Sequence, residues 1–95
     1  MQFEQFKTSL AGAAPPAGVS LPAQALWWQA KGDWHRAHRC CQDAADENGA
    51  WAHAYLHRVE GDATNSAGWY KRAGKPPATT PLEQEWEEIA RAVLQ

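Results

Sequence analysis

Two stretches of the chain repeat one pattern, and this repetition constrains the fold more than any other feature of the sequence. Residues 26–44 and 55–73 align without a gap, and the two copies place Gly32-Asp33 and Gly61-Asp62 at the same point. A small residue, a larger one and a small alanine then follow at equal spacing: Ala37, Cys41 and Ala44 in the first copy, and Ser66, Tyr70 and Ala73 in the second. Glycine commonly ends a helix and aspartate commonly begins one, so each copy predicts a helical hairpin.

The predicted fold is all-α, with two hairpins stacked over about residues 22–45 and 50–74 in a single domain of residues 21–95. The small residue lets the two helices of a hairpin approach closely, and the larger side chain fills the space one turn on. The run Asp46-Glu47-Asn48-Gly49 predicts a loop between the hairpins. Residues 1–20 are expected to be an N-terminal segment with a Pro/Gly/Ala-rich connector, containing a short amphipathic helix at best.

A last helix over residues 81–94 is expected to cap the stack. Thr80 is positioned to cap this helix, and Pro81 suits its first turn. Three of its acidic residues are expected to form a solvated face: Glu85, Glu87 and Glu88.

The second helix of the second copy, Ser66…Trp69-Tyr70-Lys71-Arg72-Ala73, is similar to that of a Sel1-like unit. The double pattern over residues 22–77 resembles the tetratricopeptide repeat and its Sel1-like relatives. This resemblance implies a module without catalytic activity of its own that binds a protein or peptide on a concave face, lined by the first helix of each unit. The residues carried onto that face are Leu26, Gln29, Ala30, Asn48, Trp51, Tyr55 and Arg58.

A second interpretation of the same face is that Trp51 and Tyr55 are core residues covered by the final helix, since they belong to a broad apolar arc. Two repeats are also fewer than a stable solenoid usually needs, because each unit buries its apolar surface against neighbouring units. The final helix can supply that cover, and a homodimer that stacks the repeats is the other solution.

Composition and charge exclude several classes of protein. The formal net charge of -2 provides no overall field that attracts nucleic acid or an acidic membrane surface. Six tryptophans are more than a small core easily hides, which predicts that some remain for an interface. The adjacent Cys40 and Cys41 are interpreted as reduced thiols acting as small hydrophobes, and with a poor signal peptide they favour the cytoplasm. No catalytic or cofactor motif is recognised, so an enzyme is not expected.

His53 and His57 are four residues apart, a spacing that can hold a divalent metal ion on one face of a helix. A helical wheel places the pair on a polar face, whereas the repeat register turns it inward, where a structural role is expected. A metal site needs further ligands, and the candidates are Glu60, His35, His38, Cys40 and Cys41. A small metal-binding protein is therefore the alternative to the interaction module.

Overall fold

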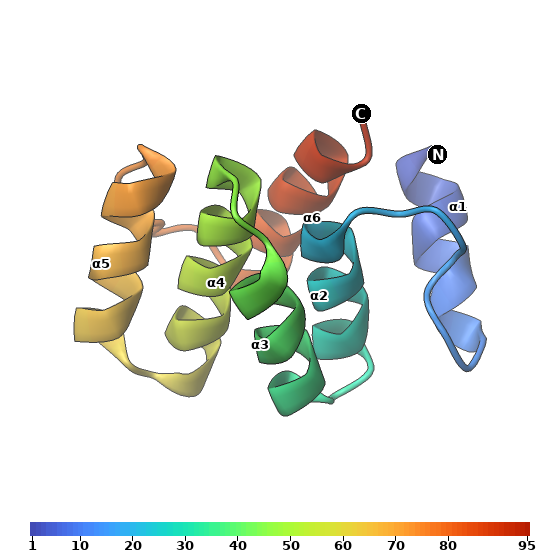
Figure 1. Ribbon diagram of the computed structural model, residues 1–95, viewed down its shortest axis with the longest axis horizontal. Helices are drawn as coiled ribbons and strands as arrows, with labels where there is room; N and C mark the ends of the chain where they lie inside the picture. The colour runs from blue at the N-terminus through green and yellow to red at the C-terminus, as the bar shows by residue number, and fades with distance from the viewer.

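The chain folds into six α-helices and one short 3-10 turn, without strands, and the predicted all-α class is confirmed. The computed structural model describes residues 1–95 (Figure 1). None of the helices combines the length and apolarity needed to span a membrane. In chain order the elements are α1 (Phe3–Thr8), η1 (Ser9–Ala11), α2 (Leu21–Ala30), α3 (Trp34–Asp43), α4 (Glu47–Glu60), α5 (Ala63–Ala73) and α6 (Leu82–Val93).

Both Gly-Asp pairs form the tight turns that the repeat predicts. Gly32 and Gly61 have φ angles of 86° and 87°, a left-handed conformation that side chains with a Cβ rarely adopt. Asp33 and Asp62 then begin α3 and α5, and each carboxylate accepts the backbone N–H of the residue three positions on at 3.1 Å. The turns therefore reverse the chain at the two points where the sequence repeats.

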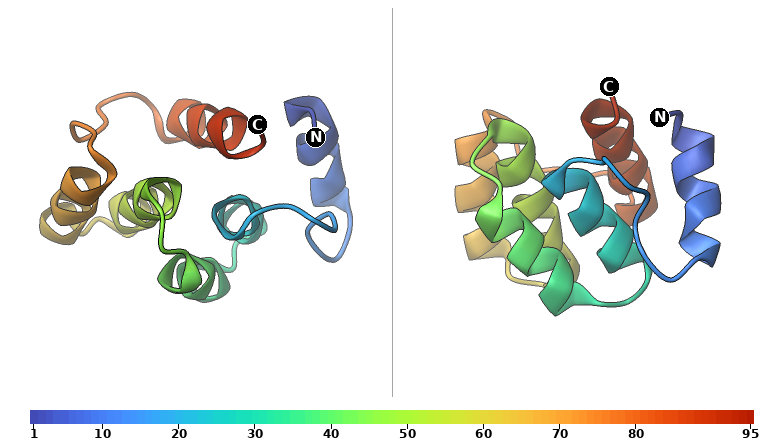
Figure 2. Two further views of the ribbon diagram at one scale, coloured as in Figure 1. Left: turned by 45° about the horizontal axis from the view of Figure 1, so that its top comes forward. Right: turned by 45° about the vertical axis from the view of Figure 1, so that its right-hand side comes forward.

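The two hairpins, α2 with α3 and α4 with α5, lie side by side, because α4 packs against both α2 and α3. The chain then returns along residues 74–81, and α6 packs against α4 and α2. Figure 2 shows α6 on the far side of these two helices from α3. Helix α4 is consequently enclosed by four other helices.

The N-terminal segment is fastened to the outer end of this arrangement. Phe3 and Phe6 are buried against Trp86 of α6, with ring centroids 6.0 and 5.8 Å apart. The Trp27 indole N–H donates to the Ser9 hydroxyl at 3.0 Å, which ties η1 to α2. The short amphipathic helix expected near the N-terminus thus finds an apolar surface to cover.

Glu85 corrects the prediction of a solvated acidic face on the last helix, because this side chain is only 1% exposed. Its carboxylate accepts hydrogen bonds from the Tyr70 hydroxyl at 2.5 Å, from Arg58 Nη1 at 2.9 Å and from the Trp51 indole N–H at 3.3 Å. A buried charge is tolerated only when it is paired and hydrogen-bonded, and these three donors meet that condition. Glu85 therefore joins α6 to both α4 and α5.

One predicted helix boundary and one predicted helix cap are wrong. Helix α4 begins at Glu47 and not near Ala50, because the Asp46 carboxylate accepts the Gly49 N–H at 2.8 Å and turns the expected loop into a first helical turn. Helix α6 begins at Leu82 without a side-chain cap. Thr80 was expected to cap this helix. Its backbone carbonyl instead accepts a hydrogen bond from the guanidinium of Arg58.

The tryptophans correct a third expectation, since none of the six is exposed. Arg36 lies over the ring of Trp28 at 4.2 Å from its centroid, and Arg72 lies over Trp69 at 4.7 Å. Cation–π contacts of this kind cover an aromatic face without a partner protein. The other four indoles donate N–H hydrogen bonds inside the chain: Trp27, Trp34, Trp51 and Trp86.

We predict that Glu85→Ala lowers the free energy of unfolding by about 3 kcal/mol, because it leaves three donors without their acceptor and a guanidinium without its counter-charge. Urea denaturation followed by circular dichroism measures this loss. Glu88→Ala, an exposed site on the same helix, is the matched control and should stay within about 0.5 kcal/mol of the native protein. Equal stability of the two variants would contradict the role given to Glu85.

Candidate metal centre

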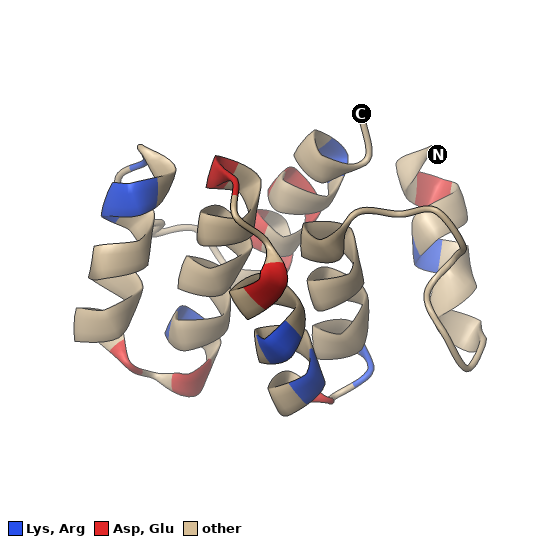
Figure 3. Cartoon of the chain, in the orientation of Figure 1, with Lys and Arg blue, Asp and Glu red and all other residues tan.

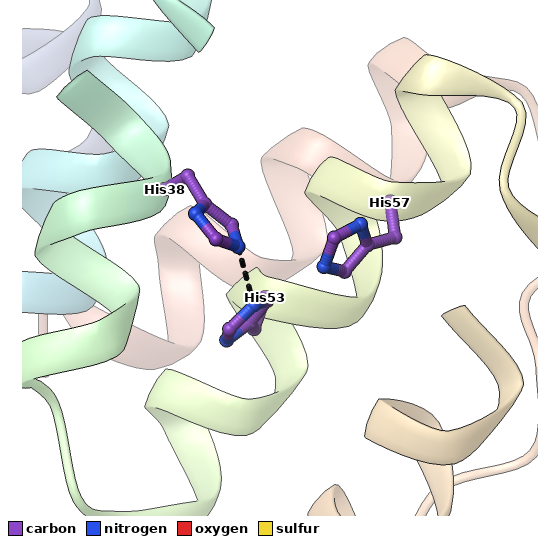
Figure 4. A group of neighbouring side chains, drawn as sticks. All are labelled: His38, His53 and His57. Carbon is purple, nitrogen blue, oxygen red and sulfur yellow. Dashed lines mark hydrogen bonds between the residues drawn. The ribbon is translucent and has the colours of Figure 1, made fainter. Parts of the chain in front are cut away.

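Three histidines converge between α3 and α4 (Figure 4). His38 comes from the middle of α3, and His53 and His57 come from successive turns of α4. One ring nitrogen from each lies within 4.8 Å of the other two. His53 and His57 are 4% and 5% exposed, so the polar face drawn by the helical wheel is wrong and the inward orientation is correct. The wheel fails because α3 and α5 also pack on α4.

His38 and His53 meet through their Nε2 atoms, which are 2.9 Å apart. Two such nitrogens share a hydrogen bond only when one carries the proton and the other offers its lone pair. Burial, together with the neighbouring His38 and His57, lowers the pKa of His53 to about 4. Burial also lowers the pKa of His38. Both rings are therefore neutral at physiological pH, the state in which imidazole binds metals.

His57 is oriented by a carboxylate on its own helix. Its Nδ1 lies 2.5 Å from Oε2 of Glu60. A carboxylate accepts a hydrogen bond, so Nδ1 carries a proton, and the neutral form of the ring has its lone pair on Nε2. Figure 4 shows a ring nitrogen of His57 directed toward the other two histidines. Glu60, predicted as a third metal ligand, thus lies behind His57 in the position from which carboxylates orient metal-binding imidazoles.

A second set of possible metal ligands, at the end of α4, is less suited to a metal ion than the histidine cluster. His57, Glu60 and Asp62 also bring ligand atoms within 4.8 Å of one another. Glu60 and Asp62 are exposed to solvent, however, and Asp62 is occupied as the cap of α5. The three-histidine group is the better candidate because two of its rings are buried and the third is partly buried.

Two tryptophans form the walls of the histidine cluster. The rings of His53 and Trp69 are stacked with centroids 3.7 Å apart, and those of His38 and Trp34 are stacked at 4.8 Å. Sequence reasoning did not assign either tryptophan to a site. A signal was present in α3, where Trp34 and His38 are four residues apart and therefore share a helix face. The stacking restricts both imidazoles to nearly fixed planes.

The remaining predicted ligands lie outside this cluster. His35 is exposed at the start of α3. Both cysteines are free thiols, and Cys41 is a buried core residue, as the sequence indicated. Burial raises the pKa of Cys41 to about 12 and also raises the pKa of Cys40, and neither thiol lies within the group of ligand atoms that His38, His53 and His57 form. The donor set therefore consists of imidazoles.

The face predicted to bind a partner is largely covered by α6. Trp51 and Arg58 bind Glu85 on that helix, and Tyr55 belongs to the hydrophobic core. Gln29 and Tyr55 still line a groove of about 420 Å³ between α1, α2 and α6. Asn48, the fifth residue predicted to bind a partner, lies in the first turn of α4 and is partly buried.

Comparison of the chain with protein-family models, with curated proteins and with solved structures finds no match.

We predict that the metal-free protein loses about 2 kcal/mol of stability as the pH falls from about 6.5 to about 4, because His53 binds a proton in the unfolded chain before it does so in the folded one. Denaturation at several pH values, with chelator present, measures the slope. His53→Gln should reduce the slope, whereas the same change at the exposed His35 should preserve it. Identical slopes in both variants would show that His53 is not held neutral by the fold.

Proposed function

We propose that the protein binds a divalent transition-metal ion, for which zinc is the test case, through the imidazoles of His38, His53 and His57. The observation that carries this proposal is the convergence of three imidazole nitrogens within 4.8 Å of one another. They come from two packed helices and not from a loop, so their backbone positions are fixed before the ion arrives.

The spacing supports this proposal. Zinc–nitrogen bonds are about 2.0–2.1 Å long, so two nitrogens in a tetrahedral site lie about 3.3 Å apart. His38 Nε2 and His53 Nε2 are already at 2.9 Å. Small rotations of the three rings would bring the nitrogens to ligand distance, and the ion would replace the proton that His38 and His53 share. Because the proton on one ring can move to its other nitrogen, coordination by neutral rings requires no net release of protons.

The kind of metal follows from the donor atoms. Three imidazoles without a carboxylate in direct contact favour zinc, copper or nickel over magnesium and calcium, which prefer oxygen ligands. Glu60 adds the outer hydrogen bond on His57 that such sites commonly use. Three protein ligands also leave a fourth tetrahedral position for a molecule from solution.

We predict that the native protein binds one zinc ion and that His38→Ala weakens binding at least about tenfold, since it removes one of three ligands. Glu60→Gln should weaken it by about 10–100-fold, because the amide holds the His57 ring less firmly. Competition with a chromophoric zinc chelator gives the affinities.

His35→Ala, which removes an exposed histidine, is the matched control and should bind zinc like the native protein. Circular dichroism of each variant separates lost ligands from lost folding. A folded native protein that leaves all zinc on the chelator would overturn the proposal. Equal affinities of the His35 and His38 variants would also overturn it.

Binding of a peptide is a second candidate function, favoured by the groove that Gln29 and Tyr55 line. The groove has apolar walls from Phe3, Leu10 and Trp86. Its volume of about 420 Å³ lies within the range of small-ligand sites, which suits one or two side chains of a peptide.

We expect peptides selected on the native protein from a random library to lose at least about tenfold in affinity for Gln29→Ala, because the amide lies on the groove wall. Fluorescence anisotropy measures the affinities. Gln24→Ala, on the same helix but outside the groove lining, is the control. Peptides that bind all three proteins equally would exclude the groove as the binding site.

A further inference from the structure

A second cavity adjoins the histidine cluster and shares His53 with it. This cavity, of about 580 Å³, lies between the end of α3, the start of α4 and the second half of α5. Its volume is in the range of sites that hold small molecules. Apart from His53, the residues that matter for its chemistry are Asp46, Glu47, Trp69 and Arg72.

His53 has one polar atom that the protein leaves without a partner. Its Nε2 is engaged with His38, whereas its Nδ1 is buried and makes no hydrogen bond. The two nitrogens of an imidazole point in divergent directions, so Nδ1 faces away from His38. When Nε2 binds a metal ion, the neutral ring must carry its proton on Nδ1. Metal-binding histidines almost always donate that proton to an acceptor, and here the chain supplies none.

The charges around the cavity favour an anionic acceptor once the metal is bound. Three neutral imidazoles do not compensate the two positive charges of the ion, and Arg72 adds a guanidinium to the cavity wall. Figure 3 shows basic residues at the end of α5 near the acidic start of α4. Of the two acidic residues there, Asp46 is already used as the cap of α4 and Glu47 is exposed at its first turn. These two carboxylates keep their negative charges, so the ion and the cavity lining together are left with one positive charge in excess.

We propose that this cavity binds a small carboxylate that accepts the Nδ1–H hydrogen bond of metal-bound His53 and pairs with the guanidinium of Arg72. The inference rests on the proposed metal binding. In the metal-free protein Nδ1 is closed to solvent, so the carboxylate reaches it only as the ring shifts within its stacking plane to coordinate the ion. Metal and carboxylate thus strengthen each other's binding by the same factor, as thermodynamic linkage requires.

The test measures zinc affinity, by chelator competition, in sodium acetate and in sodium nitrate, both at about 0.1 M so that screening is equal. We expect zinc to bind about fivefold more tightly in acetate. Arg72→Gln should abolish this difference. Arg36→Gln, which removes another guanidinium stacked on a tryptophan but outside the cavity, should preserve it. The weak complex of zinc with acetate in solution affects all three proteins equally and cancels in the comparison.

Equal zinc affinity of the native protein in the two salts would overturn this inference and leave water as the acceptor. An acetate effect that persists in Arg72→Gln would also overturn it, because the carboxylate would then be coordinating zinc directly. In both cases zinc still binds, and the proposed function stands. Failure to bind zinc in either salt would instead remove the proposed function, and this inference with it.

Discussion

The enclosure of α4 is the constraint on which the rest of the structure depends. Helices α2, α3, α5 and α6 all pack against it, and residues 52–57 are buried without interruption. A helix covered on every side cannot send its polar side chains to water, so each must find a partner inside the protein. Arg58 and Trp51 find theirs in Glu85, on the side of α6. His53 and His57 find theirs on the opposite side, in His38 and Glu60.

The hydrogen-bonding groups of Glu85 are satisfied more completely than those of the histidine cluster. Glu85 is met by three donors, which makes it a closed junction between α4, α5 and α6. The histidine cluster leaves the Nδ1 atom of His53 without a hydrogen-bond partner. An unmet buried polar atom costs stability, and small proteins have little stability to lose. Its persistence is explained if a ligand completes the cluster.

The tryptophans connect the core to the histidine cluster. Trp34 donates its indole N–H to the backbone of Leu56 at 2.8 Å and stacks on His38. Trp69 stacks on His53 and is itself covered by Arg72. The same aromatic rings therefore fill space in a small domain and restrict the planes of two imidazoles. A cluster built this way is rigid because it is part of the packing between helices.

Local chemistry allowed the sequence by itself to determine the helices and their turns. The Gly-Asp pairs act within a few residues, through a left-handed glycine and a capping carboxylate, so Gly32-Asp33 and Gly61-Asp62 could be interpreted without tertiary information. The placement of His53 and His57 on one face of a helix could be predicted for the same reason, because the two residues are four positions apart. Tertiary structure decided which faces these helices cover. The return of α6 buried Glu85, and the packing of α3 on α4 brought in His38, because such contacts join residues distant in sequence and no local pattern encodes their approach.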